Sequence, residues 1–171
     1  MKELLYVRPD YVTRGDDAPT TLPDAHRAMR MALSVGEILD VPYGVMLAAS
    51  NALERAANDV DADERRFTVD EVAMLAEALV EIRRQLDAAI DRDNFPRGTG
   101  GDLIKREAAQ PLELDSGETD FDRVFQFEDD GRVGAIYPRM SIADLMETLP
   151  NLVGFFRNAA SRNLEVALIE E

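Results

Sequence analysis

Carboxylates are the residues of this chain most able to do chemistry. Its 171 residues include 34 Asp and Glu against 19 Lys and Arg, which gives a net charge of −15. Three of the acids, Asp59, Asp61 and Asp63, alternate with Val60 and Ala62. Carboxylate oxygens are hard ligands for Ca²⁺ or Mg²⁺, and a pair of carboxyl groups can act as general acid and base. Metal binding and acid–base catalysis are therefore the first chemistries to weigh.

The stretch from Asp59 to Glu71 resembles an EF-hand calcium loop, with acids at relative positions 1, 3 and 5 and a glutamate downstream. The resemblance implies a calcium site and covers only these thirteen residues. Two positions depart from the pattern, because Glu64 replaces the glycine of position 6 and Glu71 falls at position 13 instead of 12. Thr68 and Glu71 also match a helix capping box. The alternative interpretation is an acidic loop that caps the following helix.

Other motifs that carry chemistry are incomplete. His26 is the only histidine and there is no cysteine, so three-histidine and thiolate metal sites, disulfides and cysteine nucleophiles are excluded. The glycines between Gly98 and Asp102 match no phosphate-binding pattern, and they are interpreted as a flexible connection. We predict no cofactor and no catalytic residue. A carboxylate-based metal-dependent enzyme or a calcium-binding protein remains an alternative class.

The acids are unevenly distributed along the chain. Between Pro111 and Asp130 there are eight acids and a single base, Arg123. The eight candidate binding residues are Glu113, Asp115, Glu118, Asp120, Asp122, Glu128, Asp129 and Asp130. Such a run predicts a docking surface for a basic protein, since complementary charge speeds association. The alternatives are a solvated loop or an acid surplus that serves solubility or adaptation to high salt.

The charge pattern also restricts the class of partner. No basic cluster exceeds two adjacent arginines, as at Arg65–Arg66 and Arg83–Arg84, so direct nucleic-acid binding is disfavoured. No run approaches the roughly 18 apolar residues of a membrane span, and the N-terminal apolar stretch is too short for a signal peptide. We therefore expect a cytoplasmic protein.

The leading hypothesis is an acidic protein-binding module that masks or inhibits a basic protein partner. By charge and size it is analogous to immunity proteins, phage-encoded inhibitors and DNA-mimic proteins. This is an analogy of physical properties and involves no motif. It predicts no direct nucleic-acid contact and no membrane partner.

The clearest element that could position these groups is a helix over about 69–91. Thr68 and Glu71 cap its start, and Phe67 can pack on Val72 one turn inside. A single apolar seam follows at helical spacing: Val72, Leu75, Leu79, Ile82, Leu86 and Ile90. A seam of this kind either packs in the core or joins two copies of the chain. The second class of function is therefore a structural or oligomerisation protein, a homodimer included.

Further elements follow from turn and capping signals. We expect a strand at 4–7, helix starts at Thr21 and Ser34, a break at Pro42, and helices over 43–57 and 103–109. Beyond these we expect a hairpin over 121–137 with an Asp130–Gly131 turn, helices over 142–148 and 150–160, and a final strand over 164–169.

Together these elements predict an α+β fold in one domain, 1–171. The helical part spans about 21–110, and the hairpin, helices and final strand span about 111–171. A helical layer would pack on a small, mainly antiparallel sheet in which the terminal strands pair with the hairpin.

Overall fold

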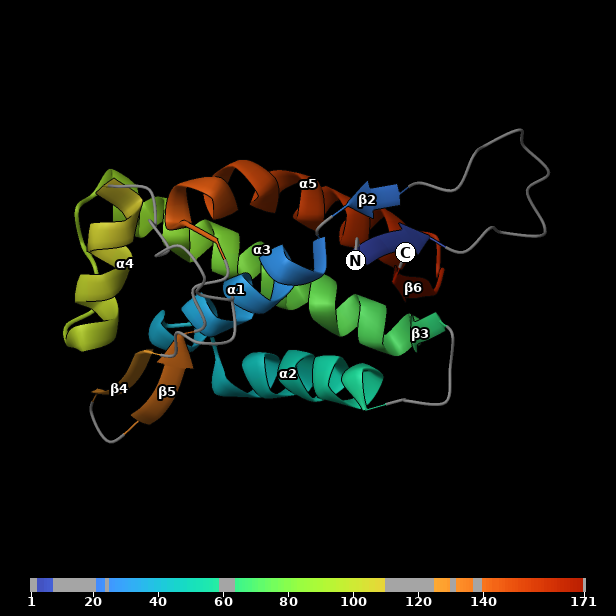
Figure 1. Ribbon diagram of the computed structural model, residues 1–171, viewed down its shortest axis with the longest axis horizontal. Helices are drawn as coiled ribbons and strands as arrows, with labels where there is room; N and C mark the ends of the chain where they lie inside the picture. The colour runs from blue at the N-terminus through green and yellow to red at the C-terminus, as the bar shows by residue number, and fades with distance from the viewer. Residues whose placement is uncertain are drawn as a thin grey trace.

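The computed structural model describes residues 3–7, 21–23, 25–58, 64–109, 125–129, 132–136 and 140–170. Within these ranges the helices are α1 (Ala25–Ile38), α2 (Tyr43–Ala57), α3 (Val69–Asp91), α4 (Thr99–Ala109) and α5 (Ile142–Ser161). The strands are β1 (Glu3–Val7), β2 (Thr21–Pro23), β3 (Glu64–Phe67), β4 (Phe125–Asp129), β5 (Arg132–Ile136) and β6 (Val166–Glu170). Figure 1 shows α3 crossing the middle of the molecule, between α5 and α2. The predicted α+β fold is confirmed.

Helix α3 begins as its capping signals predict. The Thr68 hydroxyl accepts a hydrogen bond from the Glu71 N–H at 3.2 Å, and the Glu71 carboxylate accepts one from the Thr68 N–H at 3.0 Å. This reciprocal box satisfies two of the donors that a helix start leaves unpaired. Phe67 and Val72, on either side of the cap, are fully buried.

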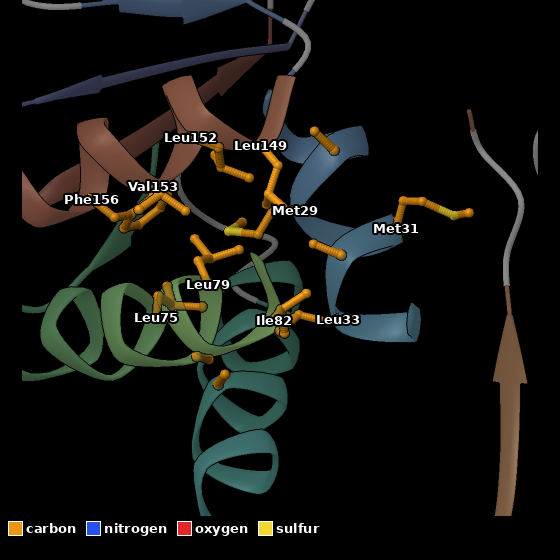
Figure 2. Close-up of a cluster of buried hydrophobic side chains, with 14 of the residues drawn as sticks. Met29, Met31, Leu33, Leu75, Leu79, Ile82, Leu149, Leu152, Val153 and Phe156 are labelled. Carbon is orange, nitrogen blue, oxygen red and sulfur yellow. The ribbon is translucent and has the colours of Figure 1, made fainter. Parts of the chain in front are cut away.

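The seam of α3 packs inside the chain, against α1, α2 and α5. Its buried residues are Val72, Leu75, Leu79, Ile82 and Leu86, with Ile90 partly buried. Figure 2 shows Met29 of α1, Leu79 of α3 and Leu149 and Phe156 of α5 converging in this core. The core therefore already covers the seam that an oligomer was expected to use.

Gly36 of α1 lies close to side chains of two neighbouring helices. A Cβ atom at this position would lie 2.8 Å from Ile82 Cγ1 and 2.9 Å from Met46 Cε. Real Cβ atoms do not approach other atoms so closely, so the side chains of Ile82 and Met46 would have to shift to admit a larger residue at this position.

All strand pairing among the described residues is antiparallel, in two separate sheets. One sheet has the order β2-β1-β6-β3, and it contacts the helices where β1 meets α1 and where β3 meets α2 and α3. The other is the predicted hairpin β4–β5. The expectation that the terminal strands pair with this hairpin is wrong for the described residues, because β1 and β6 pair with each other in a sheet separate from β4–β5.

Two predicted helix starts near α1 are also wrong. Thr21–Pro23 forms β2, whose backbone pairs with β1, and helix α1 begins only at Ala25. Ser34 lies inside α1, and its hydroxyl donates to the Arg30 carbonyl at 3.0 Å. A serine within a helix can bond in this way to the carbonyl four residues earlier, instead of capping a helix start. The break at Pro42 is confirmed, because α1 ends at Ile38 and α2 begins at Tyr43.

Helices α4 and α5 are longer than expected. Helix α4 begins at Thr99, because Gly98 adopts a φ of 105° that glycine tolerates and its carbonyl accepts from the Asp102 N–H. The glycines here are thus part of a helix start and not a flexible connection. Helix α5 runs through Pro150 as one helix, where two were predicted. Its buried positions, among them Leu149 and Leu152, continue across the proline.

Candidate functional site

Two of the eight predicted binding acids lie in β4. Glu128 pairs across the hairpin with Val133, and Asp129 pairs with Arg132. Strand β4 contacts α4 and β5 contacts α1, so the hairpin is attached to the helical part of the molecule. The other six, Glu113, Asp115, Glu118, Asp120, Asp122 and Asp130, lie outside the described residues.

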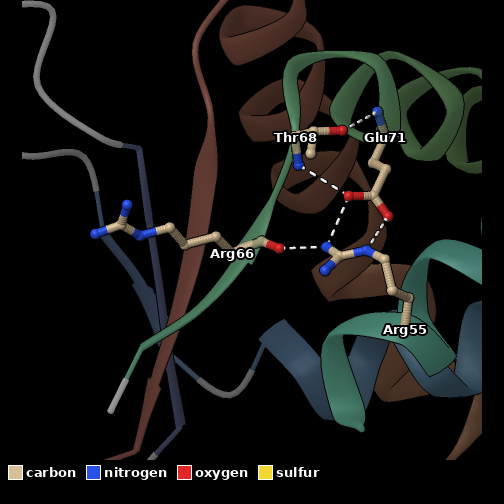
Figure 3. Close-up of polar contacts among 4 residues, drawn as sticks. All are labelled: Arg55, Arg66, Thr68 and Glu71. Atoms are coloured by element: carbon tan, nitrogen blue, oxygen red, sulfur yellow. Dashed lines mark hydrogen bonds and ion pairs between the residues drawn. The ribbon is translucent and has the colours of Figure 1, made fainter. Parts of the chain in front are cut away.

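The described part of the calcium-like stretch has a structural role. Asp59, Asp61 and Asp63 lie outside the described residues, whereas Glu64 is the first residue of β3. Glu71 caps α3 and also receives two hydrogen bonds from the guanidinium of Arg55 in α2, each of 2.7 Å (Figure 3). A carboxylate held on both oxygens by cationic donors is a poor candidate for the closing calcium ligand.

Arg55 joins three elements at this point. Its guanidinium also donates to the carbonyl of Arg66 in β3, as Figure 3 shows. Strand β3 is the last strand of its sheet, and its other edge lies next to α2. Arg55 therefore satisfies a carbonyl that would otherwise be open at the edge of the sheet.

Burial and hydrogen bonding act in opposite directions on Glu71. Partial burial raises the pKa of its carboxyl group, but the hydrogen bonds from Arg55 and from the Thr68 N–H outweigh this effect. The net pKa lies below its usual value. Glu71 is therefore held in the ionised form that the capping box and the ion pair require.

Two carboxylates, those of Glu77 and Glu81, line an open groove of about 550 Å³ on α3. The lining residues are Pro42 and Val45 of α2, Ala76, Glu77, Val80 and Glu81 of α3, and Arg157 of α5. Among the described residues, Glu77 and Arg157 make no hydrogen bond or ion pair. The groove thus combines apolar walls with a carboxylate and a guanidinium that have no partner in the described chain.

Glu81, the other acid of this groove, is paired at the surface. Arg84 donates to its two oxygens at 2.5 and 3.0 Å, and Gln85 donates at 2.9 Å. These bonds lower the pKa of Glu81 to about 2, and the bond from Arg84 has the largest effect. Glu81 and Arg84 are three residues apart, and Arg83 and Asp87, whose Nε–Oδ2 distance is 3.8 Å, are four apart; both are spacings at which side chains meet on a helix surface.

The sequence pattern did not identify the groove. Ala76 and Val80 are four residues apart and lie beside the predicted seam, which is the only local signal. Pro42, Val45 and Arg157 come from two other helices, so their proximity depends on how α2 and α5 pack on α3.

The described residues contain no group of three or more His, Asp or Glu that could hold a metal ion. No helix within these ranges has the length and apolar character needed to cross a membrane. Comparison of the chain with protein-family models, curated proteins and solved structures finds no match.

Proposed function

We propose that this protein is an acidic binding module that masks or inhibits a basic protein partner in the cytoplasm. One observation carries this proposal. The acidic segment 111–130 runs into β4 of a hairpin whose two strands contact α4 and α1. The backbone at Glu128 and Asp129 is therefore held against the helical part of the molecule at one end of that segment.

The distribution of charge gives further support. The described ranges make up about three quarters of the chain and carry 20 acidic and 14 basic residues. More than half of the net charge of −15 therefore belongs to the remaining quarter. A surplus that served only solubility would have no reason to gather in a few segments. A local surplus is what electrostatic recognition of one partner requires.

Inhibition by masking requires no catalytic group. The acids would steer a basic partner into an encounter complex and then compensate its arginines or lysines at the interface. Such long-range attraction increases the association rate most, and it weakens as salt shortens the Debye length. A DNA-mimic protein acts in this way on a nucleic-acid-binding partner, because its carboxylates replace phosphates.

The test compares two variants that each lose four negative charges. The first carries Glu113→Gln, Asp115→Asn, Glu118→Gln and Asp120→Asn. The matched control carries Asp40→Asn, Glu54→Gln, Asp91→Asn and Glu147→Gln, all at exposed positions. A partner is first isolated from the native host at low and at high salt. Its association rate with each chain is then measured by surface plasmon resonance.

We expect the first variant to associate about tenfold more slowly and to show a weaker dependence on salt. The control should lose much less, because it changes the net charge equally but leaves the segment intact. Thermal melting of both variants checks that the fold is unchanged. Equal effects of the two variants would show that only bulk charge matters, and the assignment of the segment as the binding surface would then be wrong.

A further inference from the structure

The outer edge of β3 is where the four-stranded sheet ends. Strand β3 is the last in the order β2-β1-β6-β3, and its inner edge pairs with β6. The backbone N–H and C=O groups of alternate residues along a strand point to the same edge. The Arg66 carbonyl accepts a hydrogen bond from Arg55 of α2, so the backbone groups of Arg66 and Glu64 point to the outer edge. Such an edge is a template on which a further strand can pair.

Arg55 closes this edge in two ways. Its guanidinium occupies the Arg66 carbonyl, which an added strand would need as an acceptor. Glu71 holds the guanidinium in this position, because its two carboxylate oxygens accept from Nε and Nη2 at 2.7 Å (Figure 3). Arg55 also belongs to the last turn of α2, so the same bonds keep this end of the helix beside β3. An added strand would therefore have to displace both the guanidinium and the helix end.

Strand β3 is complementary to a second copy of itself. In an antiparallel pair centred on Arg65, Glu64 of one copy lies opposite Arg66 of the other, and the reverse also holds. These are the two residues whose backbone groups point to the outer edge, so each pair would exchange two hydrogen bonds. Opposite charges across an antiparallel ladder are favourable, and the two Glu–Arg pairs outnumber the single Arg65–Arg65 contact at the centre.

We propose that Arg55 is a guard that keeps the outer edge of β3 from pairing with β3 of a second copy. While its guanidinium is bound to Glu71 and to the Arg66 carbonyl, the sheet ends at β3. Without the guanidinium, the end of α2 is released and the Arg66 carbonyl accepts from the Glu64 N–H of the second copy. The two sheets then join through β3 into one continuous sheet. This role uses no residue of segment 111–130 and does not depend on the function of that segment.

The test removes the guanidinium and measures the mass of the full chain in solution. Arg55→Met keeps an apolar stem but has neither the charge nor the donors. Light scattering after size-exclusion chromatography gives the mass at several protein concentrations. We expect the variant to dimerise at concentrations at least about tenfold lower than the wild type does. The variant is one charge more negative than the wild type, so general repulsion between copies would oppose this result.

A proline in β3 distinguishes edge pairing from other causes of dimerisation. Because the Arg66 N–H points to the outer edge, Arg66→Pro removes a donor that an added strand needs and none that pairs with β6. Arg55→Met combined with Arg66→Pro should therefore return to the wild-type mass. The control for lost stability is Ile82→Val, which shortens a fully buried side chain in the core. Its mass should stay that of the wild type.

Hydrogen exchange reports on the edge directly. In the dimer of Arg55→Met, the amides of Glu64 and Arg66 should exchange more slowly than in the wild type, because a second strand now accepts from them. Circular dichroism melts check that each variant is folded. If Arg55→Met does not fold, Glu71→Gln replaces it, since it loosens the hold on Arg55 and should also favour the dimer.

Three results would overturn the proposal. The first is a folded Arg55→Met, or Glu71→Gln in its place, that dimerises no more readily than the wild type. The second is dimerisation that persists with Arg66→Pro, and the third is equal self-association of Ile82→Val. All these variants leave segment 111–130 intact, so this proposal and the proposed function can fail separately.

Discussion

Arg55 and Glu71 form a two-point ion pair that fastens α2 to the start of α3. Arg55 Nε lies 2.7 Å from Glu71 Oε2, and Arg55 Nη2 lies 2.7 Å from Glu71 Oε1. The same carboxylate completes the capping box with Thr68. One side chain thus serves a local helix start and a contact between helices, which explains why an acid in a calcium-like stretch has a structural role.

Removing either partner should reduce stability. We expect Glu71→Ala to lower the free energy of unfolding by about 1–2 kcal/mol, because it removes a cap and an ion pair. A double-mutant cycle with Arg55→Ala should give a coupling energy of about 0.5–1 kcal/mol in urea denaturation. The looser pair Arg83–Asp87, with a distance of 3.8 Å, is the control and should couple more weakly. Equal coupling in the two cycles would contradict the special role of the Arg55–Glu71 pair.

The Glu71 contribution should depend on pH. Its pKa in the folded chain is lowered below the usual 4.5, so folding favours the ionised form. The stabilisation is therefore fully present above pH 4.5 and is lost as the pH falls through the lowered folded pKa. The stability difference between wild type and Glu71→Gln should shrink over this acidic window, as measured by urea denaturation at several pH values. A difference that stays constant down to strongly acidic pH would be inconsistent with the ion pair.

Arg84 should control the ionisation of Glu81. The hydrogen bond from Arg84 is the main cause that lowers the Glu81 pKa to about 2. In Arg84→Gln the pKa should rise toward 4.5, while the remaining bond from Gln85 keeps it somewhat lower. Carbon-detected NMR titration of the glutamate side chains measures this shift. An unchanged Glu81 resonance would show that the Arg84 contact is absent in solution.

Gly101 and Gly154 form a matched pair of helical glycines with opposite surroundings. A Cβ at Gly101 would lie 1.7 Å from the Pro96 carbonyl oxygen, whereas a Cβ at Gly154 meets nothing within 4 Å. We expect Gly101→Ala to lower stability by about 2 kcal/mol or more, since backbone must move. Gly154→Ala should raise it by about 0.5–1 kcal/mol, because alanine favours helix. Thermal melts compare the two, and equal effects would contradict the close approach of α4 to Pro96.

We expect that the stretch 59–71 does not bind calcium. Arg55 and Thr68 engage Glu71, so its use as a ligand would break the ion pair and the cap. We expect isothermal titration with Ca²⁺ or Mg²⁺ to give no saturable heat. A saturable heat in the wild type that disappears in Glu71→Gln would instead identify Glu71 as a ligand of a calcium site. Its ion pair and helix cap would then describe only the calcium-free protein.

Local signals were sufficient for some elements. The start of α3 depends on Thr68 and Glu71, only three residues apart, and its seam repeats every three to four residues. The break at Pro42 and the β4–β5 hairpin also follow from short patterns. These predictions succeeded because the deciding interactions lie within a few residues of one another.

Elements decided by distant residues were not predictable in this way. Thr21–Pro23 has the residues of a helix start, yet its backbone pairs with β1. Helix α5 passes Pro150 because Leu149 and Leu152 on either side of it are buried in the same core, and this packing outweighs the hydrogen bond that proline removes. The groove on α3 likewise requires three helices, and no local pattern contains the positions of Val45 and Arg157.

The place of β6 in its sheet has a consequence for the order of folding. Strands β1 and β3 each pair with β6, which lies between them although it comes last in sequence among the described strands. Pairing of β1 with β6 closes a loop of nearly the whole chain, the kind of non-local contact that slows folding. During synthesis, β1 and β3 cannot pair with β6 until residues 166–170 have left the ribosome. The described helices all precede β6 in the chain, so we expect the β1–β6 and β3–β6 pairings to form after those helices have been synthesised.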